Sequence, residues 1–148
     1  MAITDDHKAP PAIPGLIEWN SAFSLNIESI DSQHRMLVSI IGHLQEAMLA
    51  GRTREIVRPL FEAMHRYTKF HFDYEEKLLK ENGYPGLESH RNQHAQLIAS
   101  LQQLEDKYVA GSLHAGSPLM VFLRNWLFGH IGEHDKEFAA FLREKGVS

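Results

Sequence analysis

The feature that most constrains this chain is a repeated spacing of apolar side chains, three and four positions apart, along several segments of its 148 residues. That spacing puts an apolar stripe on one face of an α-helix and predicts that the stripe faces a core. Histidine or glutamate interrupts the stripes, and the chain holds ten histidines. A buried histidine or carboxylate costs free energy unless something pairs with it. The interruptions therefore predict a polar site inside a helical protein.

Four helices with short connections are expected, over residues 31–50, 53–81, 86–110 and 117–145. Asp31 is a candidate cap for the first helix, and Pro59 is awkward for the early turns of the second. This pattern predicts an all-α fold, an up-down-up-down four-helix bundle with an irregular N-terminal arm. We expect residues 1–30 to form the arm, packed on the bundle, and residues 31–146 to form a single-domain bundle.

Composition excludes several classes of protein. The net charge of −4 gives no reason to expect nucleic acid or an anionic membrane as partner. The absence of cysteine excludes disulfides, thiolate metal sites and a thiol nucleophile. No apolar run approaches membrane-spanning length, so no membrane insertion is expected, and the acidic, proline-broken start does not resemble a secretory signal. A cytoplasmic location is the resulting expectation.

The polar interruptions fall at corresponding levels of the four expected helices. They lie near the start of the first and third helices and toward the end of the second and fourth, which is the same end of an up-down-up-down bundle. These residues are His34, His71, Glu75, His90, His94 and His130. Imidazole and carboxylate together suit iron, zinc, copper or manganese. Five histidines exceed what one tetrahedral zinc ion needs, so two metal ions are favoured.

The other histidines are not expected at this site. His7 lies in the arm, His114 lies in a loop, and His43 and His65 lie off their stripes. Glu76, one residue beyond Glu75, is expected to face solvent because it points about 100° away.

Four short motifs make the chain recognisable. They are "IDSQH" ending at His34, "HFDYEE" with His71 and Glu75, "HRNQH" with His90 and His94, and "HIGEHD" with His130 and Asp135. In this order they resemble the hemerythrins, particularly the single-domain bacterial ones, over about residues 16–145.

The resemblance implies a non-haem di-iron centre, that is, two iron ions joined by an oxo or hydroxo bridge. It assigns His90, His94 and His130 to one iron and His34 and His71 to the other, with Glu75 and Asp135 bridging both. The second iron then keeps a vacant sixth position, where dioxygen binds. Leu127 and Trp126 match residues of the family's dioxygen pocket, although both also suit an ordinary core.

The function implied by this resemblance is reversible dioxygen binding, for carriage, storage or delivery. The alternative is an oxygen- or redox-sensing regulatory module that uses the same di-iron site and signals to a protein partner. We expect no enzymatic activity as the main function, although weak oxidase, peroxidase or nitric-oxide chemistry comes third.

Spacing and resemblance disagree on the fourth helix. On an ideal helix His134, four residues after His130, lies near the centre of the buried face, whereas Asp135 lies about 140° around the axis from His130. The family pattern selects Asp135, and so does the need of two ferric ions for anionic bridges. A π-bulge would turn Asp135 inward. Alternatively, the two metals lie far enough apart for residues on both flanks of the stripe to reach them. We predict Asp135 as the ligand.

Overall fold

The computed structural model describes residues 17–111 and 116–148, and the side chains of Ser117 and Leu127 are not among those described. A short 3-10 turn, η2 (Ser21–Phe23), precedes the long helices. These are α1 (Glu28–Leu49), α2 (Thr53–Glu81), α3 (Leu87–Val109) and α4 (Gly116–Asn125), which continues through the π-helical segment η3 (Trp126–His134) into α5 (Asp135–Glu144).

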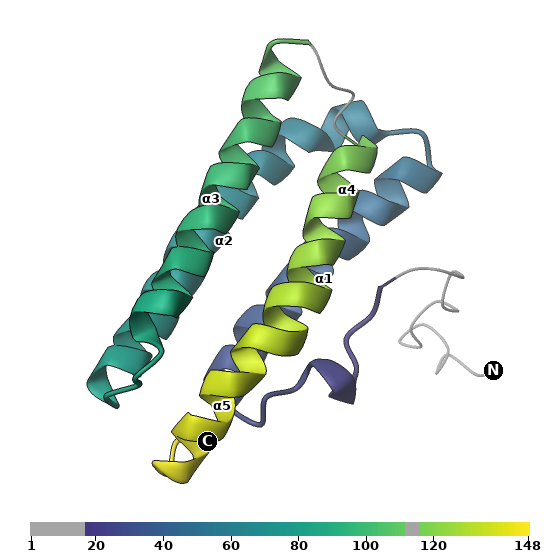
Figure 1. The fold of residues 1–148 in the computed structure, drawn as a ribbon. Coiled ribbons are helices and arrows are strands. Elements are labelled where there is room, and N and C mark those ends of the chain that lie inside the picture. Colours follow the sequence, from purple (N-terminus) through teal and green to yellow (C-terminus); the bar gives the residue numbers. More distant parts are fainter. Residues whose placement is uncertain (1–16, 112–115) are drawn as a thin grey trace, which may run out of the picture.

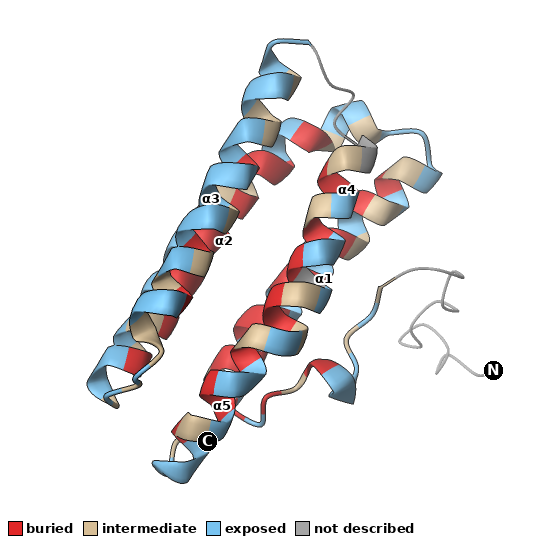
Figure 2. Cartoon of the chain, viewed as in Figure 1, coloured by how far each residue is buried: buried red, intermediate tan, exposed pale blue. Residues whose placement is uncertain are grey.

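The helices lie side by side and alternate in direction, with α4, η3 and α5 running as one continuous rod (Figure 1). The described part of the chain holds helices and no strands. Buried residues line the inward faces of the rods, and exposed residues line the outward faces (Figure 2). The expected all-α four-helix bundle is therefore confirmed, because the three-and-four spacing of the apolar residues leaves each helix one face to bury.

Two helix details differ from expectation. The helix α1 begins at Glu28, so Asp31 does not cap it. The Asp31 carboxylate instead accepts hydrogen bonds from the Ser24 hydroxyl at 2.6 Å and the Leu25 amide at 2.8 Å, and so fastens the arm to the helix. Pro59 lies inside α2, in its second turn.

The arm packs on the bundle through apolar side chains. Phe23, Leu25 and Ile27 are buried, and the Arg143 guanidinium donates a 2.6 Å hydrogen bond to the Leu25 carbonyl. This part of the predicted arm therefore belongs to the core of the domain, while residues 1–16 lie outside the described residues.

The core consists of two separate apolar clusters. The larger one occupies most of the length of the bundle and includes Leu37, Met64 and Leu123. The smaller one joins the arm to the last turns of the bundle and includes Leu25, Leu79 and Phe138. Within residues 17–111 and 116–148, no helix has the length and apolar character that crossing a bilayer requires.

Candidate metal centre

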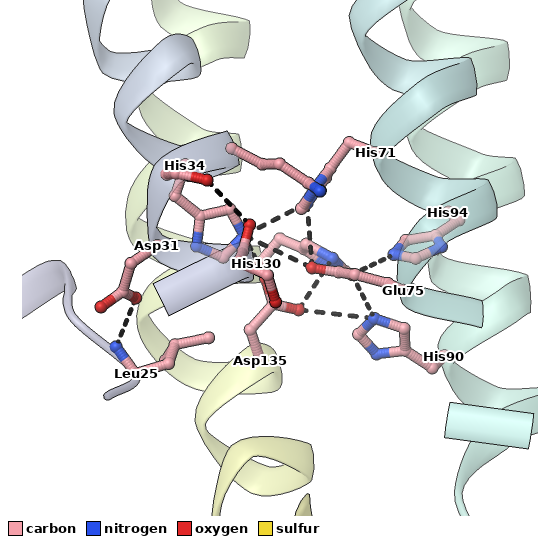
Figure 3. A network of polar contacts seen from close by, with 12 residues as sticks. Leu25, Asp31, His34, His71, Glu75, His90, His94, His130 and Asp135 are labelled. Atoms are coloured by element: carbon pink, nitrogen blue, oxygen red, sulfur yellow. Dashed lines mark hydrogen bonds and ion pairs between the residues drawn. The ribbon is translucent and has the colours of Figure 1, made fainter. Parts of the chain in front are cut away.

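A layer of polar side chains lies between the two apolar clusters. Every helical rod contributes to it, and each of its residues is at most 5% exposed. The residues are His34 from α1, His71 and Glu75 from α2, His90 and His94 from α3, His130 from η3 and Asp135 from α5. Figure 3 shows their side chains converging between the helices. The structure thus brings together all seven residues that the sequence analysis assigned to the site.

Two overlapping groups can be distinguished within this layer by the distances between ligand-type atoms. One contains His34, His71, Glu75 and Asp135, and the other contains Glu75, His90, His94 and His130. Within each group one potential ligand atom from every residue lies within 4.8 Å of the others. Each group is therefore compact enough to surround one metal ion.

The two carboxylates divide their oxygens between the groups. Glu75 Oε2 lies 2.9 Å from His71 Nε2 and 3.4 Å from His34 Nε2, whereas Glu75 Oε1 lies 3.1 Å from His90 Nε2 and 3.2 Å from His94 Nε2. Asp135 does the same: Oδ2 lies 3.3 Å from His34 Nε2, and Oδ1 lies 3.1 Å from His130 Nε2. Each carboxylate is thus placed to bridge two neighbouring ions.

The way in which Asp135 reaches this layer is explained by η3. The backbone amide of Asp135 donates a hydrogen bond to the carbonyl of His130, five residues earlier. This spacing is that of a π-helix and not of an α-helix. The wider turn brings Asp135 to the side of the helix that carries His130. Asp135 is fully buried as a result, whereas His134 is half-buried and lies 3.3 Å from the Gln93 side chain through its Nδ1.

The ionisable side chains of the layer shift one another's pKa values. Burial lowers the pKa of His34, but the carboxylates of Asp135 and Glu75, 3.3 and 3.4 Å from its Nε2, outweigh burial and raise that pKa to about 9. The pKa of His71 is lowered, by burial and by the nearby His34, whose Nε2 is only 3.2 Å away. Burial and the charge of Glu75 act to raise the pKa of Asp135, yet the contact with His130 holds it at about 2. The layer therefore keeps its carboxylates ionised.

The residues fit a pair of metal ions. Five atoms that face the centre of the layer are buried without a hydrogen-bond partner: Glu75 Oε2, His94 Nε2, His130 Nε2 and both Asp135 carboxylate oxygens. Metal–ligand bonds of about 2.1 Å set neighbouring ligand atoms on one ion about 3.0–3.4 Å apart, which is the spacing seen here. Neutral imidazole combined with carboxylate suits a first-row transition metal.

Two further residues orient the imidazoles, and sequence reasoning missed both. Gln33 accepts a 2.6 Å hydrogen bond from Nδ1 of His71, which leaves the Nε2 lone pair of His71 for the layer. The expectation that Glu76 faces solvent is wrong. It is 24% exposed, lies 3.3 Å from Nδ1 of His94 and pairs with Arg91. The sequence signal that could have identified Gln33 and Glu76 is their position in the motifs, directly beside His34 and Glu75.

The residues assigned to a dioxygen pocket are only partly described. Trp126 is 2% exposed, and its ring lies 5.4 Å from Phe72 and 6.1 Å from Tyr67. It also lines a surface pocket of about 350 Å³ together with His130 and His134. Leu127 is part of η3, but its side chain lies outside the described residues.

The remaining histidines stay away from the layer where they are described. His65 is half-buried and lies 3.4 Å from Glu105, and His43 borders a separate pocket between α1 and α2. His7 and His114 lie outside the described residues.

Comparison with known proteins places this site in a family. Residues 25–142 match the family model described as the hemerythrin HHE cation binding domain. The bacteriohemerythrin of Stenotrophomonas maltophilia is 31% identical over 84% of this chain and 80% of its own length. The bacteriohemerythrin of Methylococcus capsulatus is 29% identical over 86% of this chain and 97% of its own length.

Solved structures agree with this assignment. A crystal structure of hemerythrin with one leucine replaced by tyrosine superposes with a TM-score of 0.76, at 26% identity, over 84% of this chain and 95% of the other. The variant with alanine at that leucine gives a TM-score of 0.75 at 27% identity. With its family model matched across the bundle and its polar layer built from the motif residues, the chain belongs to the hemerythrin family.

Proposed function

We propose that this protein binds dioxygen reversibly at a di-iron centre held by the polar layer. His90, His94 and His130 would hold one iron, and His34 and His71 the other. Glu75 and Asp135 would bridge the two irons, each through one oxygen to either side. A pair of ferrous ions held by these residues would supply dioxygen with one electron each and recover both electrons as it leaves.

The observation that carries this proposal is the unequal number of protein atoms on the two sides. The group around His90, His94 and His130 offers three nitrogens and one oxygen from each carboxylate, five atoms in all. The group around His34 and His71 offers two nitrogens and two oxygens, four atoms in all. An ion that favours six ligands therefore has more room on the His34 side for a small molecule from outside.

The side chains around the layer support reversible binding over onward chemistry. Phe72 stacks flat on the His94 imidazole with ring centroids 3.7 Å apart, and Trp126 packs beside Phe72. Such apolar contacts keep water from the site, and a dry site slows the loss of a reduced ligand as a hydrated anion. Five neutral histidines also compensate less of the positive charge on the irons than a ligand set rich in carboxylates would. This ligand set therefore disfavours highly oxidised iron.

We also infer that catalysis is not the main role, and that oxygen or redox sensing is the second candidate. The same site serves both roles, and the difference lies in the lifetime of the oxygenated state. A carrier keeps it until oxygen pressure falls, whereas a sensor converts irreversibly to the diferric state and passes a change to a protein partner.

Rapid mixing of the diferrous protein with dioxygen tests the proposal. We expect two irons per chain and a new visible absorption that forms on mixing and disappears when the solution is degassed. Immediate, irreversible passage to the diferric form would support sensing or oxidase chemistry instead. About one zinc per chain after expression with ample iron would exclude the di-iron centre.

A further inference from the structure

Tyr67 carries a buried hydroxyl group that finds no partner in the protein. The residue lies on α2, one turn before His71, and is 5% exposed. Its hydroxyl oxygen is buried and makes no hydrogen bond. Buried tyrosine hydroxyls almost always have a partner, because an unmade hydrogen bond costs free energy. This donor therefore needs an explanation.

The ring of Tyr67 lies against a residue of the metal layer. It stacks on the His71 imidazole with centroids 5.2 Å apart and planes only 17° from parallel. His71 directs its Nε2 at Glu75 and His34. Tyr67 therefore lies directly against a residue of the group that contains His34 and His71.

The Tyr67 hydroxyl has a hydrogen to donate. An ordinary tyrosine hydroxyl is protonated at neutral pH and can donate one hydrogen bond. The neighbours of Tyr67 beyond His71 include the ring of Trp126, at 6.1 Å, which offers no acceptor. A molecule with an acceptor atom would supply the missing partner.

We propose that the Tyr67 hydroxyl donates a hydrogen bond to a small ligand that occupies the open position beside His34 and His71. This inference rests on the proposed di-iron site and goes beyond it by assigning a residue that selects the ligand. The class of ligand favoured is a small molecule or anion with a free acceptor atom at its outer end, such as dioxygen or azide. Tyr67 is then a specificity-determining residue in an otherwise apolar wall.

Azide and the variant Tyr67→Phe provide the test, since this change removes the hydroxyl and leaves the stacked ring. The matched control is Tyr108→Phe, near the C-terminal end of α3, about 21 Å along the helix from His94. All three oxidised, iron-loaded proteins are titrated with azide and followed by absorbance, and iron content is measured for each. We expect Tyr67→Phe to bind azide roughly three- to tenfold more weakly, the worth of one hydrogen bond. Tyr108→Phe should match the unchanged protein.

Two further measurements accompany the azide titration. The infrared stretch of bound azide should shift in Tyr67→Phe and not in Tyr108→Phe, because the hydrogen bond polarises the ligand. In the metal-free protein, Tyr67→Phe should melt at the same temperature as the unchanged protein or higher, because it removes an unpaired buried hydroxyl.

Equal azide affinity in Tyr67→Phe, with the iron content intact, would overturn the inference and leave the di-iron site standing. A lower melting temperature of metal-free Tyr67→Phe would also overturn it, since the hydroxyl would then have a partner in the absence of ligand. If the unchanged protein takes up no iron, the proposed function fails and this inference fails with it.

Discussion

Glu75 is the residue on which both halves of the polar layer depend. One of its oxygens lies 2.9 Å from His71, and the other lies 3.1 Å from His90. We therefore predict that Glu75→Ala loses nearly all bound iron, whereas His34→Ala keeps about one ion per chain. Iron analysis of the purified variants checks this. The control is Glu105→Ala, which removes a carboxylate from α3 that pairs with His65, away from the layer. A Glu75→Ala protein with two irons would show that the carboxylate does not bridge.

Asp135 and its neighbour His134 form a matched pair for a second prediction. Asp135 is fully buried and faces His34 and His130, whereas His134 is half-buried and contacts Gln93. Asp135→Ala should lose at least one iron per chain, and His134→Ala should keep both. Iron content and the oxygenated spectrum distinguish the two variants. Loss of iron from His134→Ala but not from Asp135→Ala would mean that His134, and not Asp135, binds the metal.

Gln33 acts on His71 through a single hydrogen bond of 2.6 Å. Replacing it with alanine removes the acceptor that keeps the His71 imidazole oriented and its Nε2 unprotonated. We expect Gln33→Ala to weaken iron binding roughly 10- to 100-fold without changing the number of ions at saturation. Competition with a chelator of known affinity measures this. Gln96→Ala, on the exposed side of α3, is the control.

In the metal-free protein, His34 should contribute a loss of stability in alkaline solution, and Asp135 a loss of stability in strong acid. The pKa of His34 rises from 6.5 to about 9 in the folded chain, so its stabilising effect is complete below pH 6.5 and is lost as the pH rises through 9. The pKa of Asp135 falls from 3.8 to about 2, so its effect is present above pH 3.8 and is lost as the pH falls through 2. Urea unfolding of the metal-free chain across this range should show falling stability above pH 6.5, and His34→Ala should flatten that fall.

At the scale of single elements, η3 is the departure from regular structure that shapes the site. A π-helical turn amounts to one extra residue in an α-helix. Deleting Gly132 should therefore return this stretch to α-helical geometry, in which His130 and the aspartate, now four residues apart, still share a face. We expect this deletion variant to fold and to retain iron.

Deleting Ala99 from the regular helix α3 is the comparison. It rotates everything that follows by about 100° and moves Leu101 out of the core, so the melting temperature should drop sharply. Melting temperature and iron content separate the two deletions. If the Gly132 deletion lowers the melting temperature as much as the Ala99 deletion does, the π-helical turn does not result from one extra residue in an α-helix.

The elements also show what sequence reasoning can reach. Helix positions and the polar layer followed from periodicity, because a stripe needs only that each helix bury one face. Position along the helix could not decide between His134 and Asp135, because the argument assumed about 100° per residue throughout. Asp31 and Glu76 were assigned from local patterns, and contacts with the arm and with α3 overrode those patterns.

At the scale of the whole molecule, metal removal should loosen the bundle. Seven ligand-type side chains share one buried layer, and without ions several of their atoms lack partners. Metal binding to the folded chain alone stabilises that state by mass action. We expect chelation to lower the melting temperature by ten degrees or more, and added iron to restore it. A metal-free protein that melts at the same temperature would argue against an ion in this layer.

The division of the core into two apolar clusters has a consequence for how the molecule opens. The smaller cluster, with Leu25, Leu79 and Phe138, is separate from the larger one, and the polar layer lies between them. With ions in place, residues on all four rods are tied together there, and both clusters form one cooperative unit. Without ions, the end of the bundle that holds the arm and α5 becomes a separate unit of lower stability. Amide protons of Phe138 to Leu142 should then exchange with solvent well before those of Leu60 to Met64, and the two sets should exchange together once iron returns.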